Sequence, residues 1–116
     1  MHEKMEAVLY HNPACGTSRN VLALLKERGI APRIVEYLHT PPTRADYEAL
    51  VARGISVSTL LRSKEPLYSE LDLDSASDEA RLDALTLHPR LLNRPLLATP
   101  KGVRACRPAE TALEIL

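Results

Sequence analysis

The first third of the chain contains two short, mainly apolar stretches. Between them, apolar residues recur at the spacing of one face of a helix. Residues 6–10, which are apolar after Glu6, predict a short buried strand. A helix should follow, capped by Thr17 or Ser18 and ended by Gly29. Its apolar stripe consists of Val21, Leu22, Leu24 and Leu25. Residues 33–38 predict a second strand, so this part should form two parallel strands with a right-handed crossover.

Three stretches in the middle of the chain combine apolar residues at helical spacing with capping or stop signals. They cover residues 44–53, 55–62 and 77–87. Thr43 and Ser77 are the expected N-caps, and Gly54 and Pro89 stand where helices should end. The segment 63–76 is polar and is predicted to be irregular.

Two short apolar stretches near the C-terminus predict a β-hairpin. Residues 95–99 and 103–106 are typical of strands, and the turn residues 100–102 between them favour antiparallel pairing. Pro108 fits the first turn of a final helix over 109–116. Two further strands and a helix therefore complete the chain.

The predicted order of elements is βαβ, then helices, then ββα. This order predicts an α/β protein with a thioredoxin-like fold. Its four-stranded mixed sheet would carry a helical insertion, about residues 43–88, between the βαβ and ββα halves. The chain has 116 residues, 45% of them apolar, which is enough for one hydrophobic core. We therefore expect a single domain over residues 1–116.

Charge and cysteine content argue against several classes of function. Lys+Arg and Asp+Glu number 15 each, so bulk attraction to nucleic acid or to an anionic membrane is not expected. No apolar run is long enough to span a membrane, and the polar residues 1–6 predict no signal peptide. Cys15 and Cys106 lie far apart in the sequence and form neither a disulfide framework nor a metal-binding spacing, which favours a reducing cytoplasm.

Cys15 lies in the loop between the first predicted strand and the first predicted helix. At a helix N-terminus, unpaired backbone N–H groups stabilise a thiolate and can bind an oxyanion. Gly16 allows the backbone to approach an anion, and His11 could add a positive charge that lowers the thiol pKa. The same residues are compatible with a small buried thiol and an ordinary loop histidine, but the strand-to-helix position favours a reactive cysteine.

Two other chemistries of such loops require residues that this chain lacks. A disulfide oxidoreductase needs a second cysteine at position 18, where the chain has Ser18. A phosphatase-type loop consists of a cysteine, five further residues and then an arginine. The arginine would stand at position 21, where the chain has Val21. Cys15 therefore has no partner thiol in its own loop, and the resolving thiol should come from another molecule.

The loop over residues 11–20, which reads His-Asn-Pro-Ala-Cys-Gly-Thr-Ser-Arg-Asn, resembles the active-site loop of the glutaredoxin-dependent arsenate reductases. Further segments resemble the same family, in order, along nearly the whole chain: 40–44, 54–56, 60–62, 88–89, 93–95 and 106–108. The resemblance implies a thioredoxin-like fold with a helical insertion and a cis peptide bond before Pro95.

The resemblance also implies the residues and reactants of a reaction. Cys15 would be the catalytic thiolate and His11 its activator. Three arginines would bind the substrate oxyanion: Arg62, Arg94 and Arg107. The implied reaction is the reduction of arsenate to arsenite in arsenic detoxification, with glutathione as co-substrate and glutaredoxin as protein partner. No bound cofactor and no metal is implied.

Two alternatives use the same fold. A redox regulator that binds RNA polymerase usually carries a switch made of two cysteines. This chain has Ser18 at the position of the second cysteine. A general glutathione-dependent thiol reductase would not need three arginines for an oxyanion. Each arginine taken alone is also compatible with a solvated surface charge, and Cys106 is interpreted as a packed core thiol.

Overall fold

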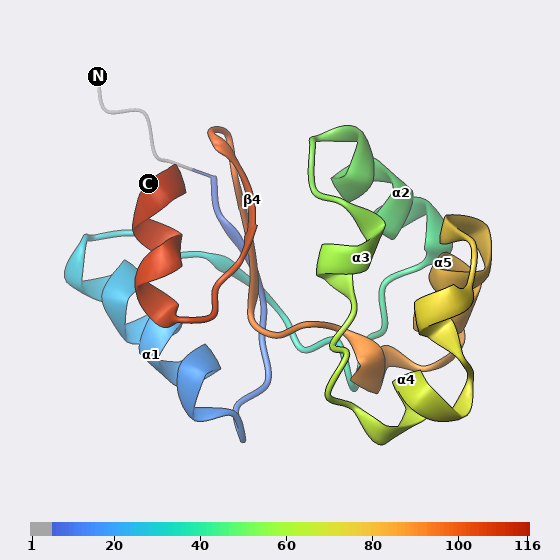
Figure 1. Ribbon diagram of the computed structural model, residues 1–116. Coiled ribbons are helices and arrows are strands. Elements are labelled where there is room, and N and C mark those ends of the chain that lie inside the picture. The colour runs from blue at the N-terminus through green and yellow to red at the C-terminus, as the bar shows by residue number, and fades with distance from the viewer. Residues whose placement is uncertain (1–5) are drawn as a thin grey trace.

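The computed structural model describes residues 6–116 and has three layers (Figure 1). A four-stranded sheet lies in the middle. Helix α1 (Gly16–Glu27) and the C-terminal 3-10 helix η3 (Ala109–Ile115) lie on one face, and a group of short helices lies on the other. Most of the polar N-terminal segment, from which we expect no signal peptide, falls in residues 1–5 and lies outside the described residues.

The sheet has the strand order β2-β1-β3-β4 and mixed strand directions. Its strands are β1 (Val8–Tyr10), β2 (Arg33–Val35), β3 (Leu96–Thr99) and β4 (Gly102–Ala105). Strand β1 is parallel to β2 and antiparallel to β3, and β3 is antiparallel to β4. The prediction of a mixed four-stranded sheet made from βαβ and ββα halves is confirmed.

The register of the strands brings three chain segments to one edge of the sheet. Tyr10 at the end of β1 is paired with Leu96 at the start of β3. Leu96 is also paired with Ala105 at the end of β4. The loops that follow β1 and β4 and the segment that precedes β3 therefore meet at this edge.

Helix α1 begins earlier than the sequence predicts, because Cys15 is its N-cap. The prediction that Thr17 or Ser18 caps the helix is wrong. The helix already begins at Gly16, after the extended backbone of Cys15, so Ser18 stands inside the first turn and its hydroxyl is bonded to His11. The helix ends just before Gly29, as predicted, and the φ of 72° at this residue suits glycine.

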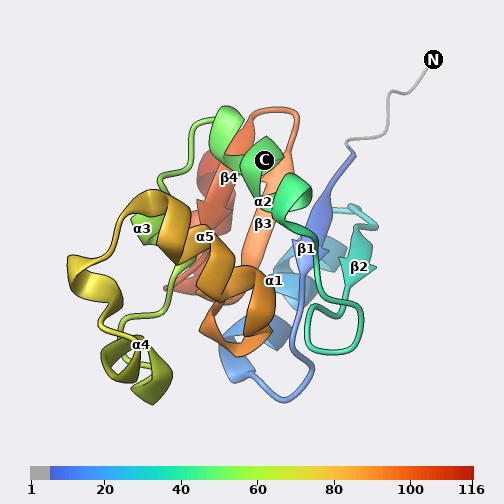
Figure 2. The same ribbon diagram turned by 90° about the vertical axis from the view of Figure 1, so that its right-hand side faces the viewer.

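Between β2 and β3 the chain forms a helical insertion, which faces the viewer in Figure 2. Its helices are α2 (Arg44–Ala52), α3 (Val57–Leu60), α4 (Pro66–Glu70), η1 (Leu73–Ser75), α5 (Asp78–Leu87) and η2 (Pro89–Leu91). The hydroxyls of Thr43 and Ser77 cap α2 and α5 as predicted. The prediction that residues 63–76 are irregular is wrong, because buried Leu67 and Leu73 anchor α4 and η1.

Several strand boundaries also differ from those predicted. Strand β1 begins at Val8 rather than at residue 6. Strand β2 stops at Val35, because the chain then turns and the N–H of Thr40 donates to the carbonyl oxygen of Glu36. Strand β4 is shifted toward the N-terminus by one residue, so that Cys106 follows it.

The C-terminal part contains two cis peptide bonds. The bond before Pro95 is cis, as predicted, and the bond before Pro108 is also cis, which the sequence did not indicate. Pro108 stands before the final helix as its N-cap rather than in its first turn. That helix is present where predicted, but it is a 3-10 helix over its described length.

Two hydrophobic clusters lie on the two faces of the sheet. The cluster toward α1 and η3 includes Leu9, Val21, Leu97 and Cys106. The cluster toward the insertion includes Tyr37, Tyr47, Leu60, Leu85 and Leu92. Within residues 6–116, no helix is both long and apolar enough to cross a membrane.

Candidate active site

Cys15 stands at the N-terminus of α1, at the sheet edge where the three chain segments meet, and its side chain is partly exposed. Burial by itself raises the pKa of the thiol. The backbone N–H of Ser18, the side chain of Arg94 and the backbone N–H of Thr17 together lower it by more, so the pKa lies below its ordinary value. The helix N-terminus and one arginine therefore favour the thiolate.

Arg94 and Arg107 reach the cysteine from the two ends of the β3–β4 hairpin. Nη1 of Arg107 lies 4.0 Å from Sγ of Cys15 and donates a 3.0 Å hydrogen bond to the carbonyl oxygen of Arg94. Nε of Arg94 is buried and has no hydrogen-bond partner within the described part of the chain. Two guanidinium groups thus stand beside the thiol, which suits the binding of an oxyanion.

Arg62 lies on the insertion side of the same site. A bridge between Leu61 and Leu92 and a 2.8 Å hydrogen bond from the N–H of Arg62 to the carbonyl oxygen of Leu91 hold this segment next to the one before β3. The chain forms a small polar pocket here, of about 190 Å³, lined by Leu61, Arg62, Ser63, Lys64, Asn93 and Arg107. Arg62 therefore shares a pocket with Arg107, while Arg94 and Arg107 approach the sulfur.

His11 is buried in the cysteine loop and is joined to Ser18. Its Nδ1 lies 2.5 Å from Oγ of Ser18, which also accepts a 3.1 Å hydrogen bond from the backbone N–H of Asn12. Burial lowers the pKa of His11, Glu36 raises it and Arg19 lowers it, and the net shift is downward. A neutral imidazole is therefore favoured at pH 7, and the groups that lower the cysteine pKa do not include His11.

Hydrogen bonds within the loop hold Cys15 at the start of the helix. The N–H of Cys15 donates to the carbonyl oxygen of Asn12 at 2.9 Å, and Oδ1 of Asn12 accepts from the N–H of Ala14 at 3.0 Å. Nη1 of Arg19 donates to the carbonyl oxygen of Pro13 at 2.8 Å. The loop is therefore closed on itself before it enters α1.

Cys106 is in a different environment from Cys15. It is fully buried in the cluster toward α1 and η3. Burial, with a smaller contribution from Glu114 and an opposing one from Arg104, raises the pKa of the Cys106 thiol to about 12. The interpretation of Cys106 as a packed core thiol is confirmed, and it stays protonated at neutral pH.

Two residues of the site have contacts that the sequence did not indicate. Ser18 joins His11 to the loop backbone, and Tyr37 lies in the turn after β2 with its hydroxyl near Arg94 and Asn12. The sequence indicates Ser18 only as a possible helix cap and as the position of a missing second cysteine, and Tyr37 belongs to no motif. The parallel pairing of β1 with β2, which puts the loops after both strands at one edge, is the signal that could have indicated Tyr37.

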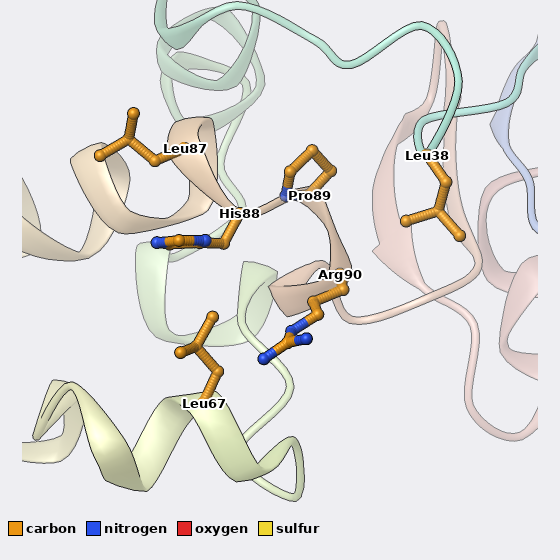
Figure 3. Close-up of a pocket in the computed structure, with 6 residues that line it drawn as sticks. All are labelled: Leu38, Leu67, Leu87, His88, Pro89 and Arg90. Carbon is orange, nitrogen blue, oxygen red and sulfur yellow. The ribbon is translucent and has the colours of Figure 1, made fainter.

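A second, larger pocket contains none of the predicted site residues (Figure 3). It has a volume of about 410 Å³ and is lined by Leu38, Leu67, Leu87, His88, Pro89 and Arg90. His88, whose imidazole is drawn in Figure 3, is the C-cap of α5, directly before Pro89. Among residues 6–116, no three His, Cys, Asp or Glu side chains are grouped so that they could hold a metal ion.

The fold and the site together define a thioredoxin-like protein in which one thiol, at a helix N-terminus, stands next to arginines from the sheet edge. Comparison with known proteins assigns it more closely. The chain belongs to the ArsC family, whose model matches residues 10–115.

Relatives that are about half identical to this chain are named arsenate reductases. The one from Rhizobium meliloti (strain 1021) is 50% identical over 115 residues, which cover 97% of this chain and 82% of the relative. The one from Escherichia coli (strain K12) is 50% identical over 111 residues, which cover 93% of this chain and 79% of the relative. The predicted resemblance to this family is confirmed.

A solved structure agrees with the fold. The arsenate reductase from Vibrio cholerae superimposes with a TM-score of 0.92 at 42% identity, over 98% of this chain and 100% of that one. The prediction of an α/β thioredoxin-like fold is therefore confirmed as well.

Proposed function

We propose that this chain is an arsenate reductase that converts arsenate to arsenite, with Cys15 as the nucleophile. Membership of the ArsC family and relatives named arsenate reductase at 50% identity support the reaction. The single observation that carries the assignment of the site is the 4.0 Å approach of Arg107 to Cys15, beside a second arginine that lowers the thiol pKa. A thiolate next to two cations is suited to attack an anionic substrate.

In the first step, Arg62, Arg94 and Arg107 bind arsenate and spread its negative charge. The Cys15 thiolate then attacks arsenic, an As–S bond forms, and one arsenate oxygen leaves as water or hydroxide. Arsenic remains pentavalent at this point. The backbone N–H groups of Thr17 and Ser18 at the start of α1 stabilise the thiolate before it reacts.

In the later steps, the electrons come from two external thiols. Glutathione displaces a second oxygen and forms an As–S bond of its own. A glutaredoxin thiolate attacks the glutathione sulfur, the As–S electron pair passes to arsenic, and glutathione leaves in a mixed disulfide with glutaredoxin. Water then cleaves the remaining bond to Cys15, so arsenite is released and the thiol is restored.

An external resolving thiol fits the surroundings of both cysteines. Cys15 has Ser18 rather than a cysteine in the next turn of its helix. Cys106 is fully buried, and the rise of its pKa to about 12 keeps it in the unreactive thiol form. A mechanism with one protein thiol and two external ones follows, and a cytoplasmic location would supply glutathione and glutaredoxin.

His11 acts in this proposal through Ser18 rather than through a positive charge. The lowered pKa of His11 favours the neutral ring, and its Nδ1 is joined to Ser18. Ser18 in turn accepts from the N–H of Asn12 and supplies one of the backbone N–H groups that lower the cysteine pKa. His11 therefore activates Cys15 by orienting the start of α1.

The reaction is tested by measuring arsenite formation with purified protein. The complete mixture contains arsenate, glutathione and a glutaredoxin, and each of the three is omitted in turn. We expect turnover only in the complete mixture. A protein that reduces a glutathione mixed disulfide but forms no arsenite would support a general thiol reductase, and binding to RNA polymerase without turnover would support a regulator.

A further inference from the structure

The hydroxyl of Tyr37 is buried at the edge of the active site without a hydrogen-bond partner. The side chain is 0% exposed, and no group within residues 6–116 is aligned to bond its oxygen. An unpaired hydroxyl in a protein interior costs free energy, because water has been removed and nothing replaces it. A residue kept in such a position therefore needs an explanation.

The fold places Tyr37 next to the cysteine loop. The N–H of His11, the first residue after β1, donates a 2.8 Å hydrogen bond to the carbonyl oxygen of Val35, the last residue of β2. The turn that contains Tyr37 and the loop that contains Cys15 consequently start side by side. Both lie at the edge of the sheet where the segment that contains Arg94 leads into β3.

The charges around the hydroxyl belong to the active site. Burial raises the pKa of Tyr37, Arg94 and Asn12 lower it, and Cys15 raises it, with a net rise. Arg94 and Asn12 are thus close enough to the hydroxyl to affect its pKa, but neither forms a hydrogen bond with it in the structure. The phenol stays protonated at neutral pH and is available as a donor and an acceptor.

Arg94 has an unpaired group of its own. Its Nε is buried and has no partner among residues 6–116, while its carbonyl oxygen accepts a 3.0 Å hydrogen bond from Arg107. Arg94, which affects the pKa of both Cys15 and Tyr37, therefore has a buried N–H donor near a buried hydroxyl, and both are unpaired within residues 6–116.

We propose that Tyr37 is a positioning residue of the oxyanion site: its hydroxyl accepts a hydrogen bond from Nε of Arg94 when a bound oxyanion draws this guanidinium toward Cys15. The inference rests on the proposed function of the site. Once Nε is held by Tyr37, the other two nitrogens of the guanidinium form a fixed fork toward the substrate. The same hydroxyl would also hold in place the side chain of Asn12, whose Oδ1 accepts from the N–H of Ala14.

Tyr47 provides a matched control. It is also 0% exposed, its hydroxyl is also unpaired among the described residues, and it packs in the same cluster as Tyr37. Burial raises its pKa, with further contributions from Tyr10, Tyr37 and Asp46, and neither Arg94 nor Cys15 contributes. Removal of this hydroxyl changes the core in the same way but leaves the active site alone.

The experiment compares Tyr37→Phe with Tyr47→Phe in the full chain. Arsenate affinity is measured by how well arsenate protects Cys15 from iodoacetamide, and turnover is measured separately. For Tyr37→Phe we expect a loss of about ten- to a hundredfold in kcat/KM for arsenate, typical of a hydrogen bond to a charged group, with an unchanged KM for glutathione. Protection should weaken in parallel. Tyr47→Phe should match the unsubstituted protein, and both variants should keep its Tm.

A double-mutant cycle identifies the partner. In an Arg94→Ala background, Tyr37→Phe should cause no further loss of protection, because the bond is already absent. Equal losses in Tyr37→Phe and Tyr47→Phe, or additive losses with Arg94→Ala, would overturn the proposal. If the unsubstituted protein makes no arsenite but the protection cycle remains coupled, the proposed reaction fails while the positioning role of Tyr37 stands.

Discussion

Arg107 and Cys15 are 92 positions apart in the sequence, yet Nη1 of Arg107 lies 4.0 Å from Sγ of Cys15. The contact is produced by the register of the sheet, in which the end of β1 is level with the start of β3 and the end of β4. The cation that contacts the thiol therefore comes from the segment after the last strand, at the edge where the loop after the first strand carries the nucleophile.

Arg107→Ala should leave the protein folded and weaken catalysis. A lost hydrogen bond to a charged group costs about 1.5–3 kcal/mol, which is about ten- to a hundredfold in kcat/KM for arsenate. Arg107→Lys should recover only part of this, because an ammonium group cannot form a two-pronged fork. Arg104→Ala is the control, since Arg104 lies on β4 and pairs with Glu114 on the surface. Normal turnover in Arg107→Ala would remove this arginine from the site.

Arg94→Ala should raise the pKa of Cys15, because the Arg94 side chain is one of the groups that lower it. For a thiol with a lowered pKa, the reactive thiolate is present above the pKa of the folded protein and is lost as pH falls through it. The midpoint of the alkylation rate against pH should therefore move to higher pH in the variant. Arg90→Ala, at an exposed residue that pairs with Glu65, should leave the midpoint in place. An unmoved midpoint in Arg94→Ala would contradict the role of this arginine.

The two cysteines should differ sharply in reactivity. In the folded protein, iodoacetamide should modify Cys15 and spare Cys106, whose thiol is fully buried with a pKa of about 12. Cys15→Ser should abolish arsenite formation, because a serine hydroxyl stays protonated at neutral pH. Cys106→Ala should keep most activity and lose some stability, on the order of 0.5–3 kcal/mol for a core change. Mass spectrometry of the labelled protein measures which cysteine reacts, and thermal unfolding measures the loss of stability. Equal loss of activity in the folded Cys15→Ser and Cys106→Ala variants would point to an internal disulfide.

Strong local signals in the sequence predicted most of the fold. Thr43 and Asp46 form a capping box three residues apart, so the start of α2 could be placed without tertiary information. Apolar runs placed the four strands to within a few residues. The α4–η1 segment was missed because Leu67 and Leu73 are too few to show a helical period, although both are buried.

The details of the site depend on contacts that no local pattern encodes. Thr17 and Ser18 are good capping residues, but Ser18 bonds His11 instead, and Cys15 becomes the N-cap. The sequence indicated that His11 lies near the thiol, yet its protonation is decided by burial, which only the fold determines. Tyr37 carries no motif, and its position beside Arg94 follows from strand pairing.

The buried histidine should give the protein a pH-dependent stability that its removal abolishes. The pKa of His11 in the folded protein lies below its ordinary value of about 6.5, so the unfolded chain binds the proton more readily. Stability therefore rises with pH wherever the unfolded state holds more protons, and it falls as pH drops through about 6.5. The Tm of the unsubstituted protein should decrease over this window.

His11→Gln should flatten this part of the profile, because glutamine does not titrate. The same variant should raise the pKa of Cys15 modestly, since the bond that holds Ser18 at the start of α1 is lost. His39→Gln, at an exposed position in the turn after β2, is the matched control and should retain the slope of Tm against pH. Thermal unfolding between pH 5 and pH 8 measures the first effect and alkylation the second. A slope that persists unchanged in His11→Gln would show that another group carries the proton, and an unchanged alkylation midpoint would show that the His11–Ser18 pair does not reach the thiol.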